Sequence, residues 1–161
     1  MTTVIEKLPI TCEDFFAMPQ TDLRSPERTC LMFLCALKLY MVNKEVGEKA
    51  INYLRGPRPM TTMEEQFLRD RLRNKPYLPL AYFRGATPSN NYVPEYPYVL
   101  NVYPDSGSDA AEEYRKVFLK TEGASQMRPV TLRKKEKKFY LWEYSSLLSD
   151  IQIPDERDPW K

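Results

Sequence analysis

The sequence contains no histidine, only five glycines and only three cysteines among its 161 residues. Without histidine, the chain lacks the commonest general acid–base group at neutral pH and the commonest nitrogen ligand of metal ions. It also lacks a glycine-rich phosphate loop, a nucleophile elbow and a Cys/His metal pattern. We therefore predict a protein that is not an enzyme, with no catalytic residues, no cofactor and no metal site.

The cysteines argue against a disulfide-stabilised secreted protein. Cys12, Cys30 and Cys35 are odd in number and unevenly spaced, unlike the paired framework of small secreted domains. Cys30 and Cys35 lie in an apolar run, which is typical of buried structural thiols.

Long hydrophobic segments are absent as well. The longest apolar stretch, "CLMFLCALKLYMV", contains Lys38 and is shorter than the roughly 20 residues that span a bilayer. The first residues, "MTTVIEKLPITCEDFFAMPQ", carry early acids and lack the apolar core of a signal peptide. We expect a cytoplasmic protein that does not contact a membrane.

The chain also lacks a strong excess of either charge, because 24 basic and 22 acidic residues leave a net charge of +2. Dedicated nucleic-acid-binding domains are usually strongly basic, so this balance argues against nucleic acid as the partner. The acidic set Asp105, Asp109, Glu112 and Glu113 lacks EF-hand spacing. We interpret it as an exposed loop before a helix start, where acids are favoured, and not as a calcium site.

The first half of the sequence has the pattern of helices. Ser25 followed by Pro26 is typical of a helix start, and the run from Cys30 to Val42 is apolar almost all round. Such a helix is central and covered on most sides. Thr62 followed by Glu65 predicts a capping box at another start. The expected helices are 26–42, 44–55 and 62–74, with a shorter one around Glu13–Met18.

The second half predicts strands. "YPYVLNVY" alternates, as do Leu78, Leu80 and Tyr82, and Val117 and Leu119 favour a strand that ends at Gly123. We expect an α+β fold in which the N-terminal helices pack on a curved antiparallel sheet formed by the C-terminal half. This element order is similar to the cone-shaped, nuclear-transport-factor-like folds. One domain is predicted over residues 1–161, with a core at 10–153 and a tail at 154–161.

The stretch "RPVTLRKKEKKFYLWEY", residues 128–144, predicts a hairpin. A two-residue turn at Lys135-Glu136 would place Leu132 opposite Phe139. Opposed residues share a face of a sheet, so one face is wholly apolar and the other mixed. The apolar face would hold Val130, Leu132, Phe139 and Leu141, and the mixed face Thr131, Arg133, Tyr140 and Trp142. Three of the latter form an open basic and aromatic patch: Arg133, Tyr140 and Trp142.

Tyrosines and prolines crowd the segment 77–103, a composition favoured in binding surfaces. The alternative is that these tyrosines hold the loop against the protein's own core. The hairpin patch also has alternatives, a strip that binds single-stranded nucleic acid or a turn that is merely solvated. The candidate interaction surface comprises Tyr82, Arg84, Tyr92, Tyr96, Arg133, Tyr140 and Trp142.

Four motifs carry a resemblance to a known family. "YFRGATPSNNYVPEYPY", "RPVTLRKK", "LWEYSSLLSDIQIP" and "DPW" resemble the signature of a family of small uncharacterised proteins, a domain of unknown function, from Firmicutes, mainly clostridia-type gut bacteria. The resemblance covers roughly Cys12 to Trp160. Related chains tend to have a glycine in the last hairpin turn, where this chain has "KKEKK". The resemblance implies no activity, cofactor or site residues.

These observations predict a small bacterial protein that acts as a non-enzymatic protein-interaction module, with a protein partner or self-association. It would use the Tyr/Pro-rich loop and the aromatic sheet face. The alternative is a small-ligand-binding protein or a carboxylate-using enzyme with a pocket between helix and sheet.

Overall fold

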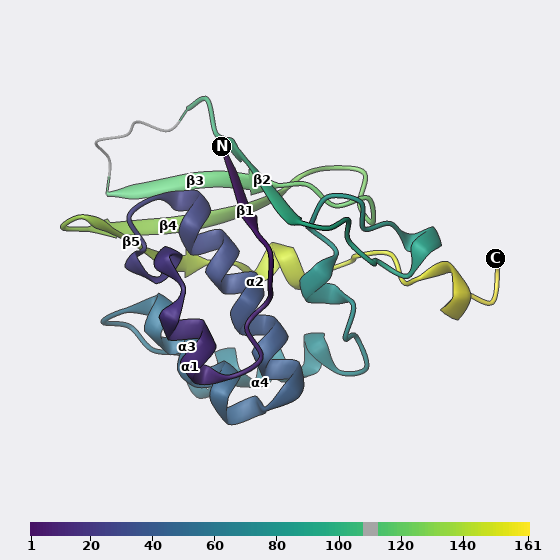
Figure 1. Ribbon diagram of the computed structural model, residues 1–161, viewed down its shortest axis with the longest axis horizontal. Helices are drawn as coiled ribbons and strands as arrows, with labels where there is room; N and C mark the ends of the chain where they lie inside the picture. Colours follow the sequence, from purple (N-terminus) through teal and green to yellow (C-terminus); the bar gives the residue numbers. More distant parts are fainter. Residues whose placement is uncertain (108–112) are drawn as a thin grey trace.

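The computed structural model describes residues 1–107 and 113–161 and has an α+β fold. Helices of the N-terminal half pack against a curled, five-stranded antiparallel sheet that forms half a barrel. In Figure 1 the sheet lies on one side, helices α1, α3 and α4 lie on the other, and α2 runs between them. The helices are α1 (Cys12–Ala17), α2 (Pro26–Val42), α3 (Lys44–Arg55) and α4 (Thr62–Leu72). The strands are β1 (Thr2–Ile5), β2 (Tyr98–Pro104), β3 (Tyr114–Leu119), β4 (Arg128–Lys135) and β5 (Lys138–Glu143). The predicted α+β class is confirmed.

Helix α2 is the centre of the molecule. It begins at Pro26, and 12 of its 17 residues are buried, because helices cover one side and the sheet the other. Helix α3 approaches it closely at Gly47, where an added Cβ would lie 2.3 Å from the Cα atom of Tyr40. The predicted bounds of both helices are confirmed.

The N-cap residue of helix α4 lies one position before the residue that the sequence suggested. Thr61, not Thr62, is the N-cap, and its hydroxyl accepts from the backbone N–H of Glu64 at 3.2 Å. The Glu64 carboxylate accepts in return from the N–H of Thr61 at 3.3 Å. The sequence "TTMEE" fits the Ser/Thr-x-x-Glu pattern twice, so pattern alone could not choose between the two. The helix ends at Leu72, two residues before the predicted end.

The sheet has the strand order β1-β2-β3-β4-β5, with each strand antiparallel to its neighbours. Its first strand comes from the N-terminus, so the prediction that the C-terminal half alone forms the sheet is wrong for β1. Thr2 pairs with Asn101, far along the chain, and four residues are too few to show a period-two pattern. The predicted alternation around Leu80 is not a strand but a 3₁₀ turn, Leu78–Leu80.

The β4–β5 hairpin turns one residue later than predicted. Its turn residues are Glu136 and Lys137, and Leu132 lies opposite Leu141 instead of Phe139. Glu136 adopts the left-handed conformation, with φ of 59°, without the glycine that usually marks such a turn. Moving the turn by one residue shifts the partners of Leu132 and Arg133 by two, so these side chains stay on their predicted faces. A β-bulge between Thr131 and Leu132, which the sequence did not indicate, places Thr131 opposite Glu143.

The outer edge of β5 is covered by the helical half of the chain. The N–H of Phe139 donates to the carbonyl of Leu23 at 2.8 Å, and the hydroxyl of Thr29 donates to the Phe139 carbonyl at 2.6 Å. These bonds occupy backbone groups that an uncovered edge strand would offer to another chain.

Side chains fill the space between α2 and the sheet. Leu31, Leu34 and Leu37 of the helix and Leu141 of β5 are at most 1% exposed and belong to one hydrophobic cluster. Among the described residues, no helix is long and apolar enough to cross a membrane.

Candidate functional site

A row of aromatic and basic side chains crosses the face of the sheet that is turned away from α2, here called the outer face. Tyr114 of β3 lies opposite Arg133 of β4, which lies opposite Tyr140 of β5. Trp142 follows two residues along β5 and meets the ring of Tyr114 edge-on, with centroids 5.4 Å apart. Tyr114, Arg133 and Tyr140 share a face because they occupy directly opposed positions of neighbouring strands, and the ring contact brings Trp142 to them.

The connection between α3 and α4 forms the opposite wall and closes the row into a groove of about 420 Å³. We call this hollow the outer groove. Its lining residues are Arg55, Pro57, Arg58, Glu113, Arg133, Lys134, Lys135, Tyr140 and Trp142. The groove therefore combines the α3–α4 connection with Glu113, which precedes β3, and with the β4–β5 hairpin, which are distant from that connection in sequence.

Two guanidinium groups lie over the indole of Trp142. The Cζ atom of Arg58 is 4.5 Å from the ring centroid, and that of Arg133 is 4.7 Å away. Both distances fall in the range of cation–π attraction, which holds the long side chains beside the ring. Trp142 thus positions positive charge inside the groove.

The charges of the outer groove do not balance. Arg133 pairs with Glu113 at 2.5 Å, and Arg55 pairs with Glu64 at 2.8 Å. Among the residues that the structure describes, no salt bridge reaches Arg58, Lys134 or Lys135. Lys134 lies opposite Phe139, and its ammonium is 5.6 Å from the centroid of that ring. Arg58 and Lys135 are therefore the two cations that the groove offers to an anionic ligand.

Arg55 anchors the far wall. It is only 3% exposed, and besides Glu64 it donates to the carbonyls of Arg58 at 3.1 Å and Trp142 at 3.2 Å. The next residue, Gly56, has φ of 64° and lies against the ring of Tyr140, where an added Cβ would come within 2.5 Å. Only glycine fits both this conformation and this contact.

A second, more apolar hollow of about 240 Å³ adjoins the outer groove and shares Trp142 with it. Its apolar lining comes from Met63, Phe67 and Tyr144, and Met63 is 80% exposed. Burial raises the pKa of Tyr144 to about 12, so its ring is neutral at physiological pH. We call this hollow the apolar annex. The outer groove therefore offers cationic surface and the apolar annex offers apolar surface, and Trp142 lines both.

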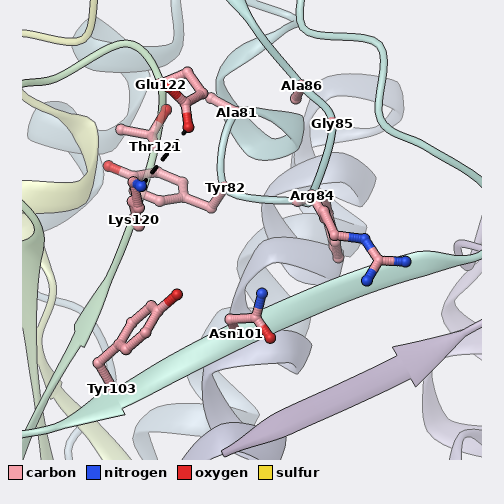
Figure 2. Close-up of a pocket in the computed structure, with 11 residues that line it drawn as sticks. Ala81, Tyr82, Arg84, Gly85, Ala86, Asn101, Tyr103, Lys120, Thr121 and Glu122 are labelled. Atoms are coloured by element: carbon pink, nitrogen blue, oxygen red, sulfur yellow. Dashed lines mark ion pairs between the residues drawn. The ribbon is translucent and has the colours of Figure 1, made fainter.

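Figure 2 shows a different hollow, of about 190 Å³, between the segment Ala81–Ala86, β2 and the turn after β3. Its charged groups are already paired: Lys120 with Glu122 at 3.9 Å, and Arg84 with Glu95 at 3.1 Å. The guanidinium of Arg84 points away from Lys120 and Glu122 in Figure 2. This hollow therefore offers less unpaired charge than the outer groove.

The structure divides the seven predicted surface residues. It brings Arg133, Tyr140 and Trp142 together in the outer groove, while Tyr82 and Arg84 line the hollow of Figure 2.

The Tyr/Pro-rich loop is mostly held against the body of the protein. Tyr82 and Tyr92 do not contribute exposed surface, because they are 4% and 0% exposed. Their hydroxyls donate to the carbonyls of Leu147 and Gln152. Tyr96 is 73% exposed and lines none of these hollows. The alternative that the tyrosines hold the loop to the core applies to Tyr82 and Tyr92.

Sequence reasoning missed Arg55 and Arg58 as groove residues. The only signal was "YLRGPRP", in which a helix end with glycine and two prolines places two arginines in a fixed turn. Nothing local shows that this turn reaches the sheet. Of the predicted acidic loop, Asp109 and Glu112 lie outside the described residues. Within residues 1–107 and 113–161, no group of three or more His, Cys, Asp or Glu side chains could hold a metal ion.

Fold and groove together define an α+β protein whose half-barrel sheet carries a basic, aromatic groove on its outer face. The chain belongs to the family described as Domain of unknown function (DUF6935), whose model matches residues 7–155. The predicted resemblance to a family of unknown function is thereby confirmed, while the origin in Firmicutes stays a prediction. No curated protein and no solved structure matches the chain, so the likeness to nuclear-transport-factor-like folds stays an analogy of element order.

Proposed function

We propose that the protein is a non-enzymatic protein-interaction module and that the outer groove binds an acidic, aromatic-containing segment of a partner protein. The observation that carries this proposal is a pair of groove cations, Arg58 and Lys135, that form no salt bridge with any residue the structure describes, and Arg58 lies over the ring of Trp142. Arginine and tryptophan are the residues most often found at the energetic centres of protein interfaces. The apolar annex extends the groove with surface for an uncharged side chain.

A protein segment fits the charge distribution better than nucleic acid. The net charge of the chain is only +2, whereas dedicated nucleic-acid-binding domains are usually strongly basic overall. A nucleic-acid site would need positive charge along several phosphates. A short acidic segment needs it at one place only.

The ligand-pocket alternative has less support. The space between α2 and the sheet is occupied by Leu34, Leu37 and Leu141, which are at most 1% exposed. The hollow of Figure 2 is small, and its charged side chains already pair with one another. Neither feature presents the unpaired charge that the outer groove presents.

Binding to synthetic peptides tests the proposal. The probes are a fluorescein-labelled peptide that combines aspartate, glutamate and one tryptophan, and a matched peptide with lysine in place of the acids. We expect fluorescence anisotropy to show binding of the acidic peptide only, and about tenfold weaker binding for Arg58→Glu. Raising the salt from about 50 to about 300 mM should weaken binding as well.

Lys137→Glu is the matched control, because it makes the same charge change at the hairpin turn, outside the groove lining. It should bind the acidic peptide nearly as well as the wild type. Equal binding of both peptides, or equal loss in Arg58→Glu and Lys137→Glu, would contradict a specific groove.

We further propose that the protein acts in the bacterial cytoplasm, which is supported by its three free cysteines, unlike the disulfides of small secreted domains, and by the family resemblance. Fractionation of cells that carry the native gene tests this. Recovery of the protein in the secreted fraction would contradict it.

A further inference from the structure

The segment after the last buried proline, Pro154, presents acids and a bare indole to solvent. Trp160 is 92% exposed, the highest value among the large hydrophobic residues that the structure describes. Asp155, Glu156 and Asp158 precede it, and the Asp158 carboxylate accepts from the Trp160 N–H at 2.9 Å, which fixes the turn. We call residues 155–160 the tryptophan segment.

The basic residue within the tryptophan segment contacts the body of the protein but stays exposed. Arg157 donates to the carbonyl of Asn74 at 2.7 Å, and its guanidinium lies 5.6 Å from the ring centroid of Tyr77. This contact holds the segment against the body of the protein. It leaves the exposed Glu156 and Trp160, and the half-buried Asp155 and Asp158, without a cation in these contacts.

The tryptophan segment matches the outer groove and the apolar annex in chemistry. Within the described residues, Arg58 and Lys135 of the groove have no salt-bridge partner, and the annex, which shares Trp142 with the groove, is lined by Met63 and Phe67. In the segment, the hydrogen bond from the Trp160 N–H to the Asp158 carboxylate keeps an acid within one turn of the indole. An acid in the groove and an indole in the annex can therefore come from one such segment.

The segment cannot fill the groove of its own molecule. Figure 1 places residue 161 at one end of the longest axis, while β4 and β5 lie toward the other. With Arg157 held on Asn74, the residues through Trp160 extend by only about 11 Å. Any groove that the segment enters therefore belongs to another molecule.

We propose that the occupant of the outer groove is the tryptophan segment of a second copy of this chain. This inference rests on the proposed function and names its partner. Trp160 would pack on Met63 and Phe67, and the acids Glu156 and Asp158 would face Arg58 and Lys135. The two surfaces are unlike one another, so each molecule carries one donor segment and one acceptor groove.

Sedimentation velocity of the full chain, over a range of protein concentrations, tests the inference. The wild type should show a mass that rises with concentration and falls toward the monomer in high salt. Trp160→Ala and Arg58→Glu should each remain monomeric, with self-association weakened at least about tenfold. Both changes lie at exposed positions, so circular dichroism should show the wild-type fold.

Mixing the two variants gives the decisive measurement. Trp160→Ala keeps an intact groove and Arg58→Glu keeps an intact segment, so an equimolar mixture should form a heterodimer although neither variant self-associates. A mixture that stays monomeric, or variants that assemble as the wild type does, would overturn the inference. A monomeric wild type that still binds the acidic peptide through Arg58 would overturn self-association and leave the proposed function standing.

Discussion

At the scale of single residues, two buried tyrosines link the fold to pH. Tyr92 and Tyr144 are 0% and 4% exposed, and burial raises the pKa of each to about 12. In the unfolded chain a tyrosine titrates near about 10. The neutral ring is therefore the form that the folded protein favours, and the Tyr92 hydroxyl needs its proton to donate to the Gln152 carbonyl.

We expect the free energy of unfolding to fall between about pH 10 and pH 12, because tyrosines that ionise in the unfolded chain stay protonated in the folded one. The stabilising contribution is complete below about pH 10 and is lost as the pH rises toward the folded value. The loss is at most about 1.4 kcal/mol per pH unit for each tyrosine. Urea unfolding at about pH 8 and pH 11 measures it.

Tyrosine-to-phenylalanine variants separate buried from exposed rings in this experiment. Tyr92→Phe and Tyr144→Phe should reduce the fall in stability with pH, whereas Tyr96→Phe, at a position 73% exposed, should leave it unchanged. An identical fall in all three variants would show that other groups cause it.

At the scale of elements, the start of α4 shows which of two possible capping boxes the protein forms. The structure uses Thr61 and Glu64 as the capping box, whereas the sequence permits Thr62 and Glu65 equally well. We expect Thr61→Ala to lower the free energy of unfolding by about 1 kcal/mol, since the N–H of Glu64 loses its acceptor. Thr62→Ala, one residue later, should change it by less than about 0.5 kcal/mol. Urea denaturation of both variants measures the difference, and the reverse order would move the cap to Thr62.

The same scale shows what a sequence can predict for this protein. Helix α2 is predictable because its start signal at Pro26 and its apolar surface are both local. The faces of β4 and β5 are predictable because alternation survives a shifted turn, so Arg133 and Trp142 were placed together correctly.

What could not be predicted depends on distant contacts. β1 is recognised only by its partner β2, and Arg58 becomes a groove residue only because the α3–α4 connection reaches the sheet. The sequence around Tyr92 does not distinguish this buried residue from an exposed tyrosine such as Tyr96. Tyr92 is buried because the segment around Gln152 lies against it, and no local sequence pattern indicates this contact.

At the scale of the whole molecule, Arg55 joins the two layers. Its guanidinium bonds Glu64 of α4 and the Trp142 carbonyl of β5, and it lies 5.7 Å from the ring centroid of Tyr144. Removing it would leave a half-buried carboxylate and two carbonyls without their donor.

We expect Arg55→Ala to lower the free energy of unfolding by about 3 kcal/mol, because breaking one side of a buried ion pair strands the other. Arg58→Ala, an exposed change three residues away, should cost less than about 1 kcal/mol. Urea denaturation of both variants measures this contrast. Equal and small losses would mean that Arg55 does not hold the layers together.

The place of β1 in the sheet has a consequence for how the chain matures on the ribosome. Thr2–Ile5 is made before the four helices, but its partner strand Tyr98–Pro104 is made more than 90 residues later, after them. At about 5–20 residues per second, the N-terminal strand waits several seconds for its partner while α2 and α3 can already pack together. The nascent helical half must therefore remain soluble while the sheet-facing side of α2 is still incompletely covered, and this cover is complete only when β5 (Lys138–Glu143) has been made.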